Sequence, residues 1–438
     1  MLHRAILAAV FSVLCLGSPD RADVLTGTAL HAAMPAPASP HSPSSAPQPA
    51  GQPSPSLEAA TAASPAIVAA GPAATASPPP GRRPNPPPAP APTPASTLAP
   101  ASRPPLPALR GVQLHALWDS EYSGLATELD LTARAGANTV RVDVGWSSLE
   151  TEGPGVLSDW YVSRLDSLMR AAAQRHLGVV ATLWSTPCWA SSAPESIRQG
   201  CAGSWWDRGV VQYPPTDPAA YGRIAAWLTR RYGTGLAALE VWNEPNLTDG
   251  RFLVAADHAA AYATLLRAGY SGARSGDARV PVLAGSLGSA DQPFLIRLYQ
   301  HGIRGFYDGI SVHPYNEWRD PRDPWQPQYR QYTFLPGIQW IRDAQRAQGD
   351  TTPLWLTEFG WTTATNTTWH VTEGQQAAYI ATAFDLLRQL PYVRAALVYD
   401  LRDEGSDPAA MDSHFGLTTT GLVPKQAYWS LRQALTAS

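Results

Sequence analysis

The sequence predicts an α/β protein, a (β/α)8 TIM barrel preceded by a disordered segment rich in proline and alanine. From Arg110 onward, eight short apolar runs alternate with eight stretches of helical periodicity. Alternating strands and helices indicate parallel strands with right-handed crossovers, and eight such units over this length fit a closed barrel. An open doubly wound sheet is the main alternative. It is disfavoured because no glycine-rich phosphate loop follows the first apolar run.

The expected strands are apolar over most of their length, because both faces of a barrel strand are buried. In chain order they are GVQLH (111–115), NTVRVDVGW (138–146), LGVVATLW (177–184), LEVWNEP (239–245), VPVLAGSLG (280–288), DGISVHPY (308–315), PLWLTEFGW (353–361) and RAALVYDLRDEG (394–405). Pro245 ends the fourth run, since proline lacks an N–H and fixes φ. The expected helices have helical periodicity and are residues 121–136, 158–176, 217–232, 255–274, 292–303, 335–347, 373–389 and 424–436.

Residues 1–22 are expected to be a signal peptide. His3 and Arg4 precede the apolar run AILAAVFSVLCLG, which is too short to span a bilayer comfortably. An uncleaved anchor is the alternative reading, because no clear A-x-A cleavage site follows. We therefore expect a secreted or periplasmic protein, with tethering to the envelope as a further option, and no membrane span after signal cleavage.

Residues 23–107 are expected to form a disordered tether. Residues 31–107 contain 24 of the 43 prolines of the chain, interspersed with alanine, serine and threonine. Such a composition cannot bury enough apolar surface to offset chain entropy, and proline removes backbone donors. Residues 108–438 are then the folded (β/α)8 domain, which we expect to be monomeric.

Charge and cysteine content exclude several classes of function. The net charge is −3 and the pI is about 6.4, so no basic surface indicates binding to nucleic acid or to an anionic membrane. Outside the signal peptide only Cys188 and Cys201 remain, and an oxidising compartment favours a disulfide between them. Two thiols are too few for a metal site, and the histidines lack H-x-H or H-E-x-x-H spacing. No metal and no other cofactor is expected.

Polar and aromatic residues gather at the carboxyl ends of the expected strands, which is where barrel enzymes hold their active sites. Single polar residues at strand ends are commonplace, whereas a converging ring of them indicates function. The residues, from the first strand to the eighth, are His115, Trp118, Trp146, Trp184, Asn243, Glu244, His313, Tyr315, Glu358, Trp361, Asp400, Arg402 and Asp403.

Two of these residues are carboxylic acids in similar surroundings. Glu244 lies in VWNEPN and Glu358 lies in WLTEFGW, at the ends of the fourth and seventh expected strands. Both side chains should therefore face the same mouth of the barrel. Glycosidic bond cleavage needs one protonated acid that donates to the leaving oxygen and one carboxylate that attacks the sugar carbon. Tryptophans supply flat apolar faces for sugar rings.

The VWNEPN and WLTEFGW motifs resemble those of clan A retaining glycoside hydrolases. The resemblance is greatest to family 39, which includes β-xylosidases and bacterial endoglycosidases that trim exopolysaccharide. It extends from Leu109 to about Leu435. It implies a catalytic barrel that cleaves β-glycosidic bonds in a polysaccharide, such as an exopolysaccharide or a plant cell-wall glycan, by double displacement. Glu244 would be the general acid/base and Glu358 the nucleophile.

The resemblance also implies roles for residues around this pair. Asn243 would hydrogen-bond the sugar 2-hydroxyl, and Tyr315 would orient Glu358. Arg141 would keep Glu358 ionised, because a nearby cation lowers the pKa of a carboxylate. His115 and His313 would line the floor of the sugar site.

The eighth strand departs from the family pattern. Many members of the clan place a tryptophan at its end, beneath the reacting sugar, whereas this chain has Tyr399, Asp400 and Asp403. The reacting sugar therefore remains open.

Some residues have structural alternatives. Glu240 is expected to be an ion-pair partner of Arg141 rather than a catalyst. Trp184, Trp206 and Trp361 are expected to bind substrate, although the loop CWASSAPESIRQGCAGSWWD could equally pack Trp206 in its interior. The alternative function is a non-catalytic glycan-binding barrel tethered to the envelope. It is disfavoured because a pure binder has no need of both carboxylates.

Overall fold

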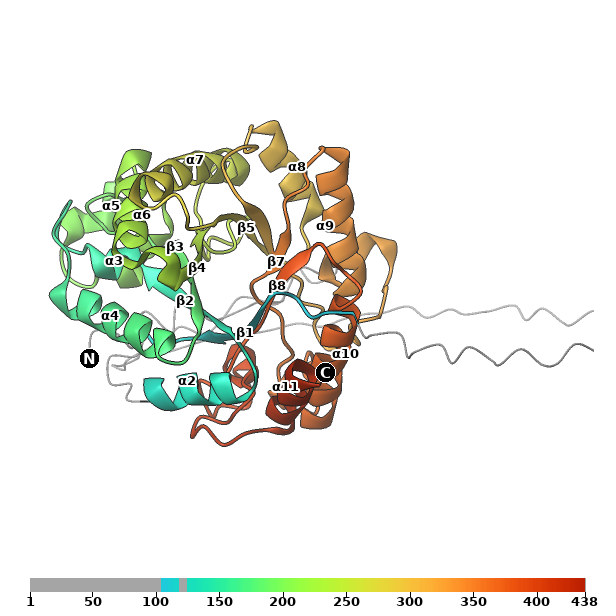
Figure 1. Ribbon diagram of the computed structural model, residues 1–438. Coiled ribbons are helices and arrows are strands. Elements are labelled where there is room, and N and C mark those ends of the chain that lie inside the picture. Colours follow the sequence, from blue (N-terminus) through green and yellow to red (C-terminus); the bar gives the residue numbers. More distant parts are fainter. Residues whose placement is uncertain (1–103, 118–123, 438) are drawn as a thin grey trace, which may run out of the picture. The chain divides into compact units, whose positions relative to one another are not determined.

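The computed structural model describes residues 104–117 and 124–437. The expected signal peptide, residues 23–103 of the expected tether, and Trp118 lie outside the described residues. Eight parallel strands close a barrel in the order β1 to β8, and the main helices surround it (Figure 1). The predicted (β/α)8 fold is confirmed.

The strands form a ring because the first pairs with both the second and the last. Most strand residues are buried, as in β5, where all 7 residues are buried. Parallel strands covered by helices on one side and by the barrel interior on the other are apolar on both faces. The bounds are β1 Leu109–Leu114, β2 Thr139–Gly145, β3 Gly178–Trp184, β4 Leu236–Val241, β5 Val282–Gly288, β6 Gly309–His313, β7 Leu354–Leu356 and β8 Val393–Val398.

All eight expected helices are present, and most begin at a side-chain cap. Ser158, Asp217, Asp257 and Asp291 each accept a hydrogen bond from a first-turn N–H, and Thr372 forms a capping box with Gln375. Within the part of the chain that the structure describes, no helix is long and apolar enough to cross a membrane. The long helices are α2 Leu125–Arg134, α4 Asp159–Ala173, α6 Pro218–Tyr232, α7 His258–Gly276, α8 Gln292–Gln300, α9 Leu335–Ala347, α10 Glu373–Leu387 and α11 Gln426–Thr436; α3 Trp146–Leu149 and α5 Glu195–Arg198 are short.

Helices α6 and α7 pack at backbone distance. A Cβ atom added to Gly272 of α7 would lie 1.9 Å from the carbonyl oxygen of Gly222 in α6. No side chain fits there, so glycine is required for the contact. This close packing fixes the helices beside β4.

Three strands end four or more residues earlier than the sequence predicts. The fourth was expected to reach Pro245, but β4 ends at Val241, and Trp242 and Glu244 have φ angles of 67° and 38°. The seventh was expected to reach Trp361 and the eighth to reach residue 405, but β7 ends at Leu356 and β8 at Val398. The chain therefore leaves the sheet just before the polar residues and turns them toward the barrel mouth.

Residues 104–107 contact the barrel, although the sequence analysis assigned them to the tether. The Arg388 guanidinium donates a hydrogen bond of 2.9 Å to the carbonyl oxygen of Pro104. Leu106 packs on the core and Pro107 is buried. Within the described residues, contact with the barrel is therefore already present at Pro104, before the expected boundary.

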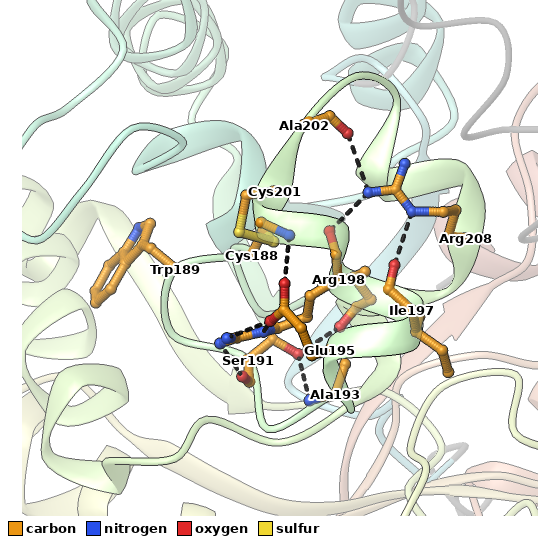
Figure 2. The surroundings of a disulfide bond; sticks show 12 residues. Cys188, Trp189, Ser191, Ala193, Glu195, Ile197, Arg198, Cys201, Ala202 and Arg208 are labelled. Atoms are coloured by element: carbon orange, nitrogen blue, oxygen red, sulfur yellow. Dashed lines mark hydrogen bonds and ion pairs between the residues drawn. A yellow bond between two sulfur atoms is a disulfide. The ribbon is translucent and has the colours of Figure 1, made fainter.

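The loop after β3 has a small core of its own, closed by a disulfide between Cys188 and Cys201 (Figure 2). The predicted pairing is confirmed. Arg208 donates to the carbonyl oxygens of Ile197, Arg198 and Ala202 at 2.7, 2.8 and 3.0 Å. These bonds and the disulfide hold a loop that has little regular structure.

Candidate active site

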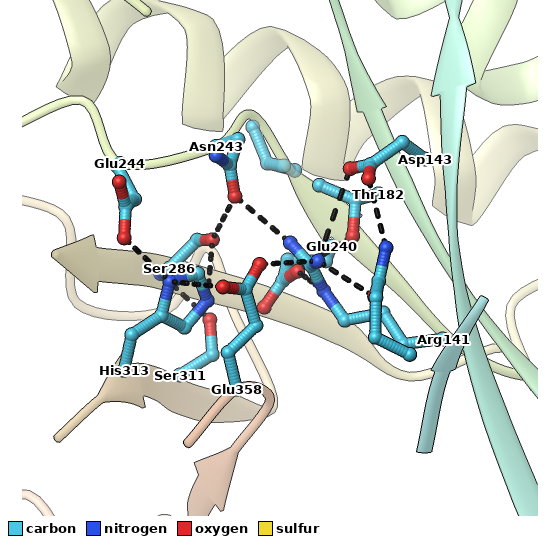
Figure 3. Close-up of polar contacts among 12 residues, drawn as sticks. Arg141, Asp143, Thr182, Glu240, Asn243, Glu244, Ser286, Ser311, His313 and Glu358 are labelled. Atoms are coloured by element: carbon cyan, nitrogen blue, oxygen red, sulfur yellow. Dashed lines mark hydrogen bonds and ion pairs between the residues drawn. The ribbon is translucent and has the colours of Figure 1, made fainter. Parts of the chain in front are cut away.

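Glu244 and Glu358 lie just beyond the carboxyl ends of two barrel strands. Glu244 follows β4, Glu358 follows β7, and His313 is the last residue of β6. The N–H of Glu244 donates a 2.9 Å hydrogen bond to the Ser286 carbonyl oxygen of β5, which fixes the turn after β4. Figure 3 shows both carboxylates directed toward the histidine from opposite sides.

His313 lies between the two carboxylates. Its Nδ1 is 2.8 Å from Glu244 Oε1 and 3.5 Å from Glu358 Oε2. One carboxylate oxygen from each glutamate and the histidine nitrogen all lie within 4.8 Å of one another. The histidine is fully buried, and burial lowers its pKa, so the imidazole is neutral. It was expected to line the sugar site, and the structure places it in direct contact with the acids.

Arg141 of β2 connects Glu358 with the interior of the barrel. Its NH1 donates to Glu358 Oε1 at 2.6 Å, and its NH2 donates to Asn243 Oδ1 at 2.8 Å. Its Nε donates to Glu240 Oε2 at 2.8 Å, so the ion pair expected for Glu240 is present. Thr182 donates to the same Glu240 oxygen at 2.7 Å. With these partners the buried guanidinium has one fixed orientation.

Tyr315 donates from its hydroxyl to Glu358 Oε2 at 2.8 Å. Glu358 therefore accepts one charged and one neutral hydrogen bond, one on each oxygen. Both favour its ionised form. The expected contacts of Arg141 and Tyr315 with Glu358 are both present.

Sequence reasoning missed several polar residues of this network, among them Thr182, Ser286 and Gln113. Ser286 of β5 contacts Asn243 Oδ1 and His313 Nε2 through its hydroxyl, both at 3.2 Å. Gln113 of β1 accepts from Arg141 at 2.9 Å and donates to Asp143 at 2.9 Å. Both interrupt an otherwise mainly apolar strand, and that interruption is the signal that could have identified them.

The two glutamates differ in how strongly they hold a proton. Burial raises the pKa of Glu244 to about 7. Its Oε2 is buried and has no hydrogen-bond partner among the described residues. Burial also raises the pKa of Glu358 above its usual value, while His313 and Arg141 oppose the increase. The expectation that Arg141 lowers this pKa was wrong in its net direction, because burial outweighs the effect of the cation. Glu358, with its cationic partner, is still the more easily ionised of the two.

The tryptophans expected to bind substrate lie in packed surroundings. Trp184 is 2% exposed and packs edge-to-face on Phe252, with ring centroids 5.5 Å apart. Trp361 is 1% exposed, donates to the Arg319 carbonyl oxygen, and packs against other aromatic rings. Trp206 is half-buried on the small core of the disulfide loop. The described contacts of these three are with neighbouring aromatic rings and loop residues.

His115 belongs to a second polar cluster. Its Nε2 is 3.1 Å from Glu404 Oε1 and 3.7 Å from Asp400 Oδ2. It also packs edge-to-face on Tyr399, whose ring in turn packs on Tyr315. The cluster is thus linked to the carboxylate pair through aromatic rings. Burial raises the pKa of Glu404 to about 8.

This arrangement places a buried acid with a raised pKa beside a carboxylate that is bonded to a cation. Glu244 can hold a proton near neutral pH, and Glu358 can remain ionised beside Arg141. Retaining glycosidases hold their two carboxyl groups about 5–5.5 Å apart, whereas inverting enzymes need about 6.5–9.5 Å. One oxygen of Glu244 and one of Glu358 lie within 4.8 Å of each other, which agrees with the shorter of the two separations. Among the described residues, the Glu244–His313–Glu358 and His115–Asp400–Glu404 groups have spacing that could also hold a metal ion.

Comparison with known proteins supports the fold and leaves the family open. No family model matches the sequence, and a search of curated protein sequences finds no match either. Among solved structures, the chain is similar to a family 39 glycoside hydrolase from Bacteroides cellulosilyticus, with a TM-score of 0.58 and 20% identity. The match covers 76% of this chain and 64% of that one, which is less than two thirds of its length.

Two further solved structures have similar barrels. A monomeric β-xylosidase from Caulobacter crescentus is 18% identical with a TM-score of 0.54, covering 76% of this chain and 70% of that one. A glycoside hydrolase of family 5, subfamily 18, from Streptomyces cattleya, in complex with GlcNAc, is 20% identical with a TM-score of 0.55, covering 76% and 82%. At such identities the similarity establishes the barrel fold.

Proposed function

We propose that this protein is a retaining glycoside hydrolase that cleaves β-glycosidic bonds in a polysaccharide by double displacement. The observation that carries the proposal is the pair of buried carboxylates with oxygens within 4.8 Å and unequal surroundings. Glu244 has a raised pKa of about 7, and Glu358 is bonded to a cation. One group is suited to donate a proton and the other to attack.

In the first step Glu358 attacks the anomeric carbon of the sugar. The bond from that carbon to the leaving oxygen breaks as Glu244 transfers its proton to the oxygen. Arg141 and Tyr315 hold the two oxygens of Glu358 and leave its orientation fixed during the attack. The products are a free alcohol and a glycosyl ester on Glu358.

In the second step water displaces the ester. Esterification removes the negative charge of Glu358, so the pKa of Glu244 falls and its carboxylate accepts a proton from the attacking water. The sugar leaves with its original anomeric configuration, and both glutamates return to their starting states. His313, neutral and 2.8 Å from Glu244, keeps the acid in place through both steps.

Several observations support the substrate class. The similar solved structures are named as glycoside hydrolases, among them a β-xylosidase. The motifs around Glu244 and Glu358 resemble family 39. Asn243, bound to Arg141 through Oδ1, is proposed to meet the sugar 2-hydroxyl. The signal-like N-terminus and the disulfide fit a secreted or periplasmic enzyme that acts on an extracellular glycan as a monomer.

Replacement of the nucleophile tests the proposal. Glu358→Ala should reduce turnover of an aryl β-glycoside by ~10³-fold or more. Added azide should partly restore it by attacking from the vacated side, and the rescued product should have inverted configuration. Glu195→Ala, at an exposed position of the disulfide loop, is the control and should keep full activity.

The outcome also separates the enzyme from a glycan-binding barrel. Wild-type protein that binds polysaccharide but hydrolyses neither polysaccharide nor any activated aryl glycoside would support the binder. Full activity in Glu358→Ala, or an inverted product from the wild type, would contradict the nucleophile assignment.

A further inference from the structure

A second group of ligating side chains lies at the junction of β1 and β8, where the barrel closes. His115 directly follows β1, and Asp400 and Glu404 follow β8. One ligating atom from each lies within 4.8 Å of the others. Nothing in the proposed hydrolysis uses this group, so its composition needs a separate explanation.

The three side chains border a small cavity of about 10 Å³. This volume is about that of one water-sized sphere and is far too small for a sugar ring. Its other lining residues are Gln113, Leu114, Glu128, Leu401 and Arg402. The occupant must therefore be a single small species.

The distances between the ligating atoms fit the edges of a coordination shell. His115 Nε2 is 3.1 Å from Glu404 Oε1 and 3.7 Å from Asp400 Oδ2. An ion with ligand bonds of about 2.0–2.2 Å has ligand–ligand edges of roughly 2.8–3.6 Å, the shorter in octahedral and the longer in tetrahedral geometry. The third pair of ligating atoms, from Asp400 and Glu404, lies within 4.8 Å, so a modest side-chain movement would complete three ligand bonds.

Two carboxyl groups of the cluster face the same histidine. Glu128 pairs with Arg402 at 3.2 Å, whereas Asp400 and Glu404 both lie beside His115. Asp400 is 1% exposed, and its Oδ1 is buried without a hydrogen-bond partner among the described residues. An unmatched buried carboxylate is costly, whereas a divalent cation would balance two of them.

We propose that His115, Asp400 and Glu404 bind one divalent transition-metal ion, Zn²⁺ or Mn²⁺. Imidazole with carboxylates suits these ions, whereas Ca²⁺ takes oxygen ligands only. The bound ion would join the end of β1 to the segment after β8 and strengthen the closure of the barrel. The site is separate from the Glu244–Glu358 pair, and its test does not depend on glycan hydrolysis.

Metal binding to the full-length protein, freed of metal by chelation, tests the site. Titration calorimetry with Zn²⁺ or Mn²⁺ alone should give one ion per chain. Glu404→Gln, which keeps the shape of the side chain and removes its charge, should weaken binding by at least about tenfold. Glu358→Gln is the matched control, because Glu358 belongs to the other group with metal-ligand spacing, and it should leave binding unchanged.

The alternative outcomes are distinct. Binding that survives in Glu404→Gln but is lost in Glu358→Gln would place the ion at the carboxylate pair and overturn the proposal. A preference for Ca²⁺ over both metals, or no binding to the wild type, would also overturn it. If Glu404→Gln does not fold, X-ray absorption at the zinc edge of the wild type decides, since one histidine with oxygen ligands is expected and a shell without nitrogen would contradict the site.

Discussion

At the scale of single residues, hydrogen bonds separate the roles of two buried glutamates with similar sequence surroundings. Glu358 accepts from Arg141 and Tyr315 at 2.6 and 2.8 Å, whereas the described contact of Glu244 is with neutral His313 at 2.8 Å. The Arg141 cation favours ionisation of its own partner most strongly. One acid therefore keeps its proton at a pH at which the other has lost it.

The motifs identified the acids and their main partners, because VWNEPN and WLTEFGW are distinctive. They did not identify Ser286 or Gln113, because one serine or glutamine in an apolar strand forms no motif. Nor could the motifs predict whether the fold raises or lowers the pKa of Glu358. That direction depends on how burial compares with the field of Arg141, and burial follows from the whole fold.

The pKa of Glu244 gives a prediction for pH dependence. In the fold this pKa is raised from 4.5 to about 7, so the protonated form is favoured. Stability linked to this group is complete below pH 4.5 and is lost as pH rises toward 7. Glu244→Gln cannot ionise, and it should be more stable than the wild type at pH 8 by up to about 3 kcal/mol. Urea unfolding at pH 4 and pH 8 measures the difference, which should be small at pH 4.

The pH dependence of kcat/KM provides a second measurement on Glu244→Gln. For the wild type, kcat/KM should fall as pH rises through about 7, because Glu244 loses the proton that the leaving oxygen needs. In Glu244→Gln that alkaline limb should disappear, and only substrates with good leaving groups should still form the glycosyl ester. An unchanged alkaline limb would assign the acid role to another group.

At the scale of helices and strands, eight strands and eight helices could be predicted because their apolar periodicities are strong. The residues at which the strands end could not be predicted in the same way. Residues Thr357, Phe359 and Trp361 are buried like strand residues, yet β7 ends at Leu356. A buried apolar sequence predicts burial, and it does not show whether the backbone still pairs with a neighbour.

Adding one methyl group to α7 by mutation tests how closely α6 and α7 pack. Gly272→Ala would ordinarily favour a helix by up to about 1 kcal/mol. Here the new Cβ would lie 1.9 Å from the Gly222 carbonyl oxygen, so the helices must separate. We expect a net loss of about 1–3 kcal/mol, measured by chemical unfolding.

The control lies on the same helix. Ser271→Ala is at an exposed position next to Gly272 and should leave stability unchanged or slightly increased. Equal stability of Gly272→Ala and the wild type would mean that the two helices do not pack at backbone distance in solution.

At the scale of the whole molecule, the sequence predicted the barrel, and the structure adds a contact between the barrel and residues of the expected tether. Proline content predicted that residues 23–107 form a tether. Composition changes gradually along the chain, so it gives only an approximate boundary. The structure shows that Arg388 of the segment after α10 bonds to Pro104. Composition cannot reveal such a contact, since it joins residues far apart in sequence.

Two truncations distinguish the tether from the start of the folded unit. Removing residues 23–103 should leave the melting temperature and the activity unchanged, because every described contact is retained. Removing residues 23–107 should lower stability by about 1–3 kcal/mol. It deletes the 2.9 Å bond from Arg388 to Pro104 and the packing of Leu106 on the core, and Arg388 is buried apart from 8% of its surface. Thermal and guanidinium unfolding measure both. Equal stability of the two truncated chains would show that residues 104–107 add nothing to the stability of the barrel. If the chain that lacks only residues 23–103 fails to fold, residues before Pro104 belong to the folded unit.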